Sequence, residues 1–254
     1  MALSIGIPDG GVVLEAKPLT QEEFYQFGSV IENPKPDLRP SPNLQQLPPN
    51  AVLANQGSAI KYADVTKMID LYGHAPSKSP SKPIITMFVS DPRALLPTAN
   101  DGILGLFPVE ILERHPFTTQ TFIPLGLSPL ENGNACYLII VAPSLPPSQL
   151  DEQLPAPDSA TGNPTLPGRG LPDLKKIRAF ICKGSQGVTY AAGTWHAPMV
   201  AIGNKHIDFI VVQYANNVNI EDCQEVELRE EQDGLGIKVA IPKELDRLVH
   251  VSKL

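Results

Sequence analysis

Four polar side chains, in two separate stretches of the chain, have residue types that could do chemistry together. Glu113 and His115 lie two residues apart in an apolar run, and Gln120 follows a turn at 116–117. His196 comes much later, within the stretch G-T-W-H-A-P. A carboxylate, an amide and two imidazoles that meet in an apolar interior are costly to bury unless they bind something. Together they suit acid–base chemistry near neutral pH or the binding of a divalent metal ion.

The stretch 107–126 must position three of these side chains, and we predict that it forms a β-hairpin. Residues alternate between the two faces of a strand, so Glu113 and His115 would share one face before the turn. After the turn, Gln120 would point into the same space. We expect the fold to bring 193–198 alongside this hairpin, so that His196 completes the set.

Short apolar runs separated by proline and glycine turns recur along the chain, which indicates a sandwich or barrel. We predict strands at about 84–90, 135–142, 177–182, 187–191 and 207–214. One helix is expected to begin after Thr20, where Glu23 completes a capping box, and to end near Gly28. The sequence therefore predicts a mainly β fold with a few short peripheral helices.

Length and charge restrict the broad class of the protein. The 254 residues, 42% of them hydrophobic, are enough for a single domain that spans 1–254 and has a sizeable core. The proline-rich stretches 34–49 and 143–173 are expected to be loops of this domain. A net charge of −7 argues against nucleic acid as a partner. No apolar run approaches the roughly 20 residues that cross a membrane, so we expect no membrane partner.

The cysteines and the C-terminal residues indicate in which cellular compartment the protein is found. Cys136, Cys182 and Cys223 are isolated, so neither a disulfide framework nor a thiolate zinc site is expected, and a reducing compartment fits them. The chain ends in Ser252, Lys253 and Leu254, which is the address read by the peroxisomal import receptor. We therefore expect a peroxisomal protein that binds this receptor; without the signal, a cytoplasmic protein is expected.

The spacing of the four polar residues resembles the two metal motifs of cupins. The first motif of cupins carries His, His and Glu on one hairpin, and the second carries a last His on another. Here Glu113 stands in place of the first His, and Gln120 in place of the Glu, whereas His115 and His196 keep their types. The alternative interpretation is that each His is a hydrogen-bonded interior residue with no ligand.

Two longer stretches resemble one family closely. They are L-E-R-H-P-F-T-T-Q-T-F-I-P-L and G-V-T-Y-A-A-G-T-W-H-A-P-M, and they resemble the ureidoglycolate lyase family. The opening P-L-T-Q-E-E-F-Y-Q-F-G-S-V-I-E and the segment A-N-Q-G-S-A-I-K-Y-A-D match as well, and F-I-V-V-Q-Y matches less well. The resemblance covers most of 17–228 and leaves out the proline-rich stretches 34–49 and 143–173.

The resemblance implies a cupin-like antiparallel β-barrel or jelly roll, and a homodimer. The implied activity is the splitting of (S)-ureidoglycolate, a small-molecule substrate, into glyoxylate and urea during allantoin and purine breakdown. A divalent metal is associated with the family, nickel first, with manganese or zinc as the other choices. The peroxisomal address agrees with this role, because purine oxidation is partly peroxisomal.

Elimination of urea needs a base near the substrate's hydroxyl, an acid near its ureido nitrogen and a cation for its carboxylate. His115 and His196 are the candidate acid and base, or metal ligands if an ion binds them. Glu113 is then either a ligand or the base. Gln120 either ligates the ion through its oxygen or hydrogen-bonds the ureido group.

Further residues are candidates for substrate binding. Lys61 lies where the resembling family often has a basic residue, so it is the candidate partner of the carboxylate; the plain alternative is a solvated lysine. Tyr190 and Asn55 are candidate hydrogen-bond donors. Trp195 either forms a wall of the pocket or packs in the core. Arg114 alternates away from Glu113 and His115 and is expected to point outward; the alternative is that its guanidinium serves a dimer interface or the substrate's carboxylate.

Three other functions are open from the sequence. An amidohydrolase acting on the same substrate would release ammonia and carbon dioxide instead of urea. The second alternative is another cupin enzyme, such as an isomerase or an iron dioxygenase. Glu113, His115 and His196 could form the two-histidine, one-carboxylate iron site that a dioxygenase would use. A cupin that binds a small hydroxy acid without turnover is the third.

Overall fold

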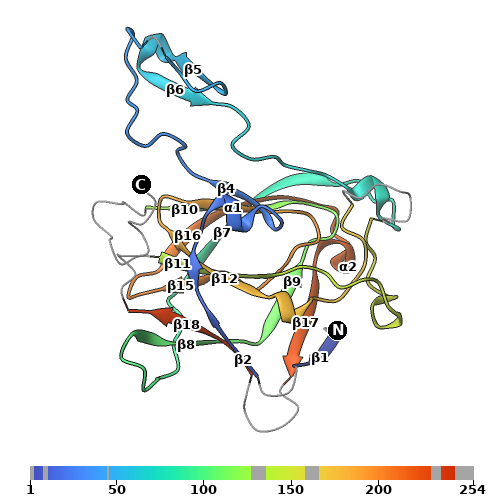
Figure 1. Cartoon of the computed structure of the whole chain (residues 1–254). Helices are drawn as coiled ribbons and strands as arrows, with labels where there is room; N and C mark the ends of the chain where they lie inside the picture. The colour runs from blue at the N-terminus through green and yellow to red at the C-terminus, as the bar shows by residue number, and fades with distance from the viewer. Residues whose placement is uncertain are drawn as a thin grey trace.

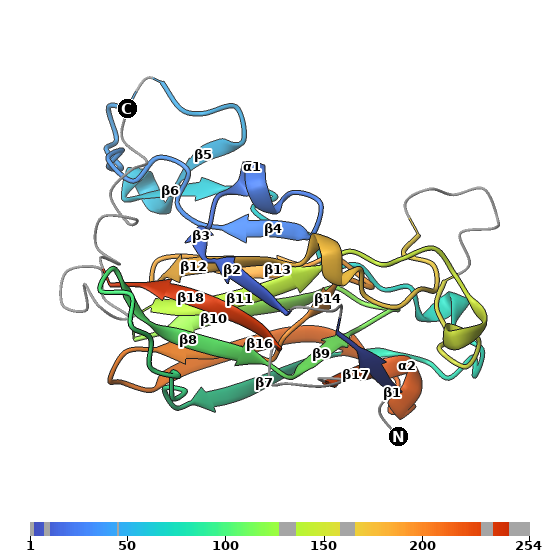
Figure 2. The ribbon, with the colours of Figure 1, turned by 60° about the horizontal axis from the view of Figure 1, so that its bottom comes forward.

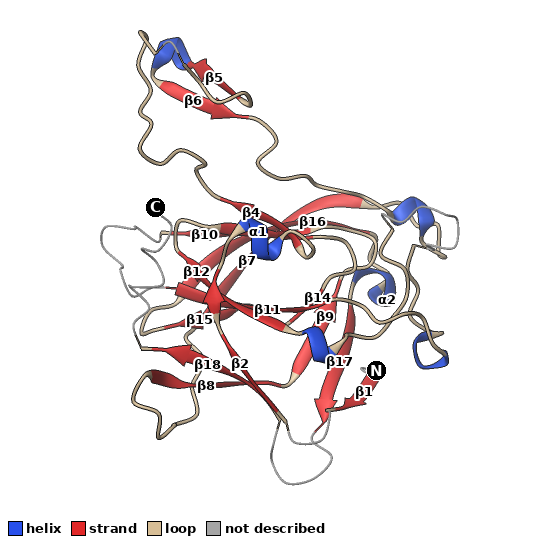
Figure 3. Ribbon diagram, in the orientation of Figure 1, coloured by secondary structure: helices blue, strands red, loops and turns tan. Residues whose placement is uncertain are grey.

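The computed structural model describes residues 3–7, 11–44, 46–126, 136–157, 166–229 and 236–243. Strands dominate these residues and the helices are short, so the predicted mainly β class is confirmed (Figure 3). Most strand pairs are antiparallel, which is consistent with the cupin-like β fold that the resemblance implies. Within the described chain, no helix is both long and apolar enough to span a bilayer.

Two sheets form the body of the protein and pack face to face. The first sheet contains β1 (Leu3–Gly6), β17 (Gln224–Arg229), β9 (Ile111–Arg114), β14 (Trp195–His196), β11 (Cys136–Ala142), β12 (Arg178–Lys183) and β3 (Lys17–Pro18), with β15 (Val200–Ile202) also paired to β11. The second sheet contains β4 (Gly28–Ile31), β13 (Gly187–Tyr190), β10 (Gln120–Leu125), β16 (Ile207–Ala215) and β7 (Lys82–Ser90). Tyr137 of the first sheet meets Phe209 of the second at a ring-centroid distance of 5.2 Å, within one apolar cluster.

A third sheet covers the other face of the first one. It contains β2 (Val12–Glu15), β18 (Ile237–Pro242) and β8 (Ile103–Val109). Leu138 and Ile140 of β11 pack in the same cluster as Phe107 of β8 and Val239 of β18. The first sheet is therefore a middle layer, and this explains why every residue of β11 is buried and apolar on both faces.

The strands on either side of the turn at 116–117 do not form the predicted hairpin. β9 pairs with β14 and β17 in the first sheet, whereas β10 pairs with β13 and β16 in the second. The turn therefore carries the chain across from one sheet to the other. The hairpin prediction is wrong because alternation and a turn locate two strands but do not determine which strand each one pairs with.

The helices are short, as predicted. Those in the described residues are α1 (Gln21–Phe24), α2 (Asn219–Asp222) and the 3-10 turns η1 (Asn55–Gly57), η2 (Tyr72–His74), η3 (Gln149–Asp151) and η5 (Leu174–Lys176). Thr20 caps α1 and its hydroxyl accepts from the backbone N–H of Glu23 at 3.2 Å. The helix ends at Phe24, earlier than predicted, because the chain turns to bury Phe27 as well and enters β4 at Gly28.

A small two-stranded sheet stands apart from the packed layers. Among the strands that the structure describes, β5 (Ala51–Ala54) and β6 (Ala59–Tyr62) pair only with each other, on either side of η1. Figures 1 and 2 both place this hairpin outside the body, at the end of the proline-rich stretch 34–49. We call residues 51–62 the arm. Its tip turns at Asn55 and Gln56, whose φ angles are 49° and 53°.

Candidate active site

Glu113 and His196 lie opposite each other on neighbouring strands of the first sheet. They are register partners in the β9–β14 pair, and one carboxylate oxygen of Glu113 is 3.5 Å from Nε2 of His196. Residues opposite each other in adjacent strands project from the same face of a sheet. The face they share looks towards the second sheet, because Tyr190 of β13 stacks on the ring of His196. The predicted meeting of the two sequence stretches is confirmed.

Gln120 reaches the same point from the second sheet. It is the first residue of β10 and is paired with Gln213 of β16. Its amide Nε2 donates to Oε1 of Gln213 at 2.7 Å, so its own Oε1 faces His196 Nε2 at 3.1 Å. The sequence analysis missed Gln213. An amide at a core-facing position of the strand I-D-F-I-V-V-Q-Y is the signal that could have found it.

His115 follows the last residue of β9 and completes the group. Its Nδ1 lies 2.6 Å from the backbone carbonyl of Asp222, at the end of α2. A carbonyl oxygen only accepts hydrogen bonds, so Nδ1 carries the proton of a neutral ring and Nε2 has the lone pair. This Nε2 is buried and has no hydrogen-bond partner among the described residues. The ring centroid of His115 is 5.6 Å from that of His196.

His196 has hydrogen-bond acceptors at both ring nitrogens. Nδ1 lies 2.9 Å from the carbonyl of Thr194, while Nε2 faces oxygens of Gln120 and Glu113. Two states satisfy this arrangement: an imidazolium that donates from both nitrogens, or a cation between Nε2 and the two oxygens. Tyr190 holds the ring in place, with centroids 4.0 Å apart and an interplanar angle of 13°.

Burial and neighbouring charges set the protonation of two of these groups. Burial, and after it the charge of His196, lower the pKa of His115 to about 4, against the opposing charge of Glu113. Burial by itself raises the pKa of Glu113, but the hydrogen bond and charge of His196 outweigh it and lower that pKa below its ordinary value. At neutral pH the site therefore holds a neutral imidazole and a carboxylate, which are forms that accept protons or ligate cations.

The donor set fits a divalent metal ion. Glu113, His115 and His196 each offer a ligand atom, and these atoms lie within 4.8 Å of one another. The buried Nε2 of His115 has no other use in the described chain, and Gln120 adds a carbonyl-type oxygen next to His196. Imidazole, carboxylate and amide oxygen together suit borderline ions.

Tyr190 and Trp195 were both candidate substrate-binding residues, and they lie on different sides of the first sheet. Tyr190 packs against His196, and its hydroxyl is buried without a hydrogen-bond partner among the described residues. Trp195 precedes His196 on the same strand and points the other way, into the cluster beneath the first sheet. Its Nε1 donates to the carbonyl of Gly170 at 3.0 Å. Of the two predicted roles for Trp195, the core role is the one that fits.

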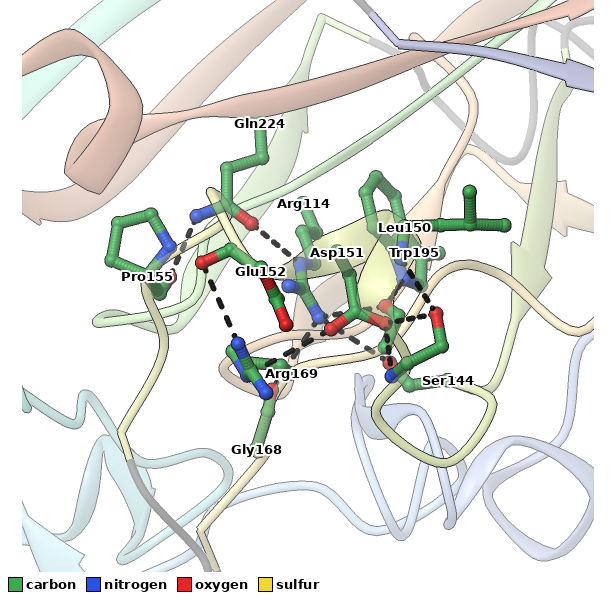
Figure 4. A network of polar contacts seen from close by, with 12 residues as sticks. Arg114, Ser144, Leu150, Asp151, Glu152, Pro155, Gly168, Arg169, Trp195 and Gln224 are labelled. Atoms are coloured by element: carbon green, nitrogen blue, oxygen red, sulfur yellow. Dashed lines mark hydrogen bonds and ion pairs between the residues drawn. The ribbon is translucent and has the colours of Figure 1, made fainter.

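Arg114 does not point outward, and that prediction is wrong. The side chain is fully buried on the face of β9 opposite Glu113, with its guanidinium carbon 4.6 Å from the Trp195 ring centroid. Nε donates to Gln224 at 2.9 Å, and another guanidinium nitrogen donates to the carbonyl of Gly170 at 3.2 Å (Figure 4). Burial lowers the pKa of Arg114 to about 10. Alternation put Arg114 on the correct face, but that face is covered by described residues of the stretch 143–173, among them Ser144 and Gly170.

Lys61 and Asn55 lie outside the site in a single chain. Both belong to the arm, Lys61 on β6 and Asn55 in η1, and the side chain of Lys61 is exposed to solvent. The sequence placed a lysine in a family-like segment but gave no information on where that segment lies. In one chain, the structure therefore does not bring either residue to His196.

A pocket of about 380 Å³ lies beside α2 and borders the same region. Its lining includes Asp222, Cys223 and Glu225. Cys223 lies with its sulfur 3.9 Å from a carboxylate oxygen of Glu113, and Glu225 is the register partner of Glu113 in the β9–β17 pair. The pocket therefore brings solvent to the two residues that adjoin Glu113.

Comparisons with known proteins of fungi and bacteria all point to the same family. The family model described as ureidoglycolate lyase matches residues 12–233. A protein of Schizosaccharomyces pombe is 40% identical over 209 residues, which is 82% of this chain and 88% of that one. Proteins of Saccharomyces cerevisiae and Burkholderia mallei are each 32% identical, over 80% and 78% of this chain and 86% and 81% of their own. All three are named ureidoglycolate lyase.

Proposed function

The chain belongs to the ureidoglycolate lyase family, and we propose that it eliminates urea from (S)-ureidoglycolate to give glyoxylate. This would make it a carbon–nitrogen lyase acting late in the breakdown of allantoin and other purine products. The observation that carries the proposal is the convergence of Glu113, His115, Gln120 and His196 between the two sheets. These are the residues that the family-like motifs contain.

The reaction requires two proton transfers and one bond cleavage. The substrate's hydroxyl loses its proton and becomes the carbonyl of glyoxylate. The carbon–nitrogen bond breaks at the same carbon, and the departing ureido nitrogen takes up a proton to form urea. A base and an acid on either side of that carbon therefore account for all atoms without an added oxidant or co-substrate.

In this proposal His115 is the base and His196 is the acid. Nε2 of His115 has a free lone pair, because Nδ1 is committed to the Asp222 carbonyl. His196 is suited to carry a proton on each ring nitrogen, since both face acceptors. Glu113 stabilises the protonated ring, and this ring delivers a proton from Nε2 to the ureido nitrogen.

The remaining polar groups orient the substrate. Gln120 offers its oxygen to the ureido N–H groups, and the buried hydroxyl of Tyr190 has a proton to donate. With a divalent ion bound, nickel by family resemblance and otherwise manganese or zinc, Glu113, His115, Gln120 and His196 would be its ligands in place of the acid–base roles given above, and the ion would supply Lewis-acid polarisation of the substrate's oxygens.

The cellular setting is part of the same proposal. The terminal residues Ser252, Lys253 and Leu254 lie outside the described residues, and their sequence supports recognition by the peroxisomal import receptor. We place the protein in the peroxisome on that basis. We also propose that it works as a homodimer.

Product analysis tests the activity. Purified protein is incubated with fresh ureidoglycolate, with and without a chelator, against a blank without enzyme because the substrate decays by itself. Urea and glyoxylate in equal amounts above the blank are expected. Ammonia without urea would instead identify an amidohydrolase, and oxygen consumption with bound iron would identify a dioxygenase. No turnover at all, with binding of a hydroxy acid, would leave a non-catalytic binding protein.

A further inference from the structure

Two sets of side chains lie back to back on strands β17, β9 and β14. On the face of the candidate site, Glu113 of β9 is the register partner of His196 of β14. One residue along, on the opposite face, Arg114 lies against Trp195, and Gln224 of β17 is the register partner of Arg114. Neighbouring residues of a strand point to opposite faces, so a contact that fixes one set also fixes the other.

The strand pairing that brings Glu113 to His196 is very short. β14 contains only Trp195 and His196, and it pairs with β9 at the single position His196–Glu113 and with β11 at two positions. By contrast, β7 pairs with β16 over all nine of its residues. A ladder of one pair leaves the register of the two strands to side-chain contacts. The contacts on the opposite face of the sheet are therefore needed to maintain the 3.5 Å approach of Glu113 to His196.

Arg114 makes such contacts to both neighbouring strands. Its guanidinium carbon lies 4.6 Å from the ring centroid of Trp195, and its Nε donates to Gln224 at 2.9 Å (Figure 4). A second guanidinium nitrogen and Nε1 of Trp195 donate to the same carbonyl, that of Gly170, at 3.2 and 3.0 Å. A planar guanidinium fixes several acceptors and an aromatic ring in one geometry, which an aliphatic side chain cannot do. Arg114 therefore joins β9 to β14, to β17 and to the segment beneath them.

The burial of this charged group is not explained by stability alone. Arg114 is fully buried and is still a cation at neutral pH, although burial lowers its pKa to about 10. Asp151, which is buried as well, is the carboxylate whose charge favours the protonated guanidinium. Buried ionic groups often contribute no more stability than apolar residues of similar volume would. The geometry that Arg114 imposes on the strands around it accounts better for its presence.

We propose that Arg114 is a positioning residue of the reaction, which holds β9 and β14 in the register that sets the Glu113 carboxylate against Nε2 of His196. It acts through Trp195 and Gln224, from the face of the sheet that the substrate does not reach. The role is the same whether Glu113 and His196 act as acid–base groups or as metal ligands, since both uses need the two side chains together. The inference rests on the proposed function for its reaction.

Steady-state kinetics of three arginine variants test this role. Arg114→Met keeps an unbranched side chain but loses the planar donors, and it should lower kcat about 10- to 100-fold, because small displacements of catalytic groups cost that much. KM should change by less than about twofold, because Arg114 makes no contact with the substrate. Arg114→Lys keeps the charge without the fork and should have an intermediate kcat. Arg178→Met, at an exposed arginine of β12 that pairs with Glu23 at 3.0 Å, should leave both constants unchanged.

A double-mutant cycle separates positioning from a loss of folded protein. In a Glu113→Ala background, Arg114→Met should lower kcat by less than about twofold further, because the contact that Arg114 maintains is already gone. A role in folding alone would instead lower kcat by the same factor in both backgrounds. Circular dichroism gives the folded fraction of each protein. Equal losses in the two backgrounds, or an Arg114→Met protein with the kcat of wild type, would overturn the proposal.

Spectroscopy tests the same contact without turnover. The ring-nitrogen NMR signals of His196, assigned with His196→Ala, should move in Arg114→Met towards their positions in Glu113→Ala and should stay in place in Arg178→Met. Trp195 is the only tryptophan of the chain, so its fluorescence reports directly on the loss of the cation beside its ring.

The two readouts distinguish this inference from the proposed function. If the wild type does not turn over ureidoglycolate, the proposed function fails, while the His196 signals still decide whether Arg114 maintains the contact with Glu113. Unchanged His196 signals in a folded Arg114→Met protein would refute the positioning role. If Arg114→Met does not fold, Arg114→Lys takes its place in the cycle and in the NMR comparison.

Discussion

Gln120 Oε1 lies 3.1 Å from His196 Nε2, and Gln213 determines that it is the oxygen which faces the imidazole. Gln213 accepts a hydrogen bond from the amide nitrogen of Gln120 at 2.7 Å, so the opposite end of the amide must be the acceptor. Gln213 therefore acts on the site through Gln120 and is a positioning residue. A ring with acceptors on both sides is thereby prepared to hold a proton or to share a cation.

Gln213→Met should lower kcat because it frees the Gln120 amide to rotate. Loss of such an orienting partner commonly costs about 10- to 100-fold in activity or metal affinity. Gln213→Glu keeps an acceptor for the Gln120 amide and should lose less. Steady-state kinetics of the two variants check this order, and equal activity of Gln213→Met and wild type would contradict the positioning role.

His115→Ala and His196→Ala should each reduce kcat roughly a hundredfold or more, because each removes an acid–base group. His74, which is exposed in η2, provides a matched histidine that should have no effect when changed to Ala. Urea release measured under saturating substrate gives the comparison. Near wild-type turnover in both site variants would remove these histidines from the mechanism.

Metal binding can be measured without any turnover. Titration calorimetry of the protein with Ni²⁺ should show one strong site, and His115→Ala should weaken it by at least about tenfold because a first ligand is lost. His74→Ala should bind as the wild type does. Equal affinity in all three proteins would mean that any bound nickel lies elsewhere.

Glu221→Gln should lower the unfolding free energy of the protein, because Glu221 anchors the segment that holds His115. The buried carboxylate of Glu221 accepts from Ser77 N–H at 2.8 Å, Ser77 Oγ at 2.6 Å and Asn216 Nδ2 at 2.6 Å, and it precedes Asp222, whose carbonyl holds His115. Replacing one carboxylate oxygen with a donor should cost about 1–3 kcal/mol in unfolding free energy. Denaturant unfolding at neutral pH measures this loss.

The pH dependence of that loss has a definite sign. Burial by itself raises the pKa of Glu221, but the hydrogen bonds from Ser77 and Asn216 outweigh it and lower that pKa in the folded protein. A depressed folded pKa contributes stability above the unfolded value, near 4.5, and this contribution disappears as the pH falls through the folded pKa. Wild type and Glu221→Gln should therefore converge in stability below pH 4.5, and a gap that widens there would contradict the assignment.

Removal of Ser252, Lys253 and Leu254 should leave the protein in the cytosol. Under the proposal these three residues serve as a receptor-read address, so turnover of the purified protein should stay unchanged. Fluorescence imaging of tagged full-length and truncated chains, with the tag at the N-terminus, checks the location. Continued import of the truncated chain would rule out this address.

Local patterns in the sequence were enough to identify the candidate site residues and most of the strands. Alternating and continuous apolar runs identified β7, β11, β12, β13 and β16. They could do so because the buried positions of a strand are apolar, and their spacing along the sequence follows the geometry of the strand. Glu113, His115, Gln120 and His196 were found as polar exceptions within such runs, and they do meet in space. These signals are local, since each depends only on neighbours along the chain.

Tertiary structure alone decided which strands pair and which faces are covered. β9 and β10 separate into different sheets, and Arg114 is buried although it alternates away from Glu113, because the first sheet is covered on both of its faces. Alternation distinguishes two faces of a strand but does not say whether solvent or protein lies beyond them. The same holds for Lys61: the sequence supplied the cation, while its position on an arm outside the body depends on contacts between segments far apart in the chain.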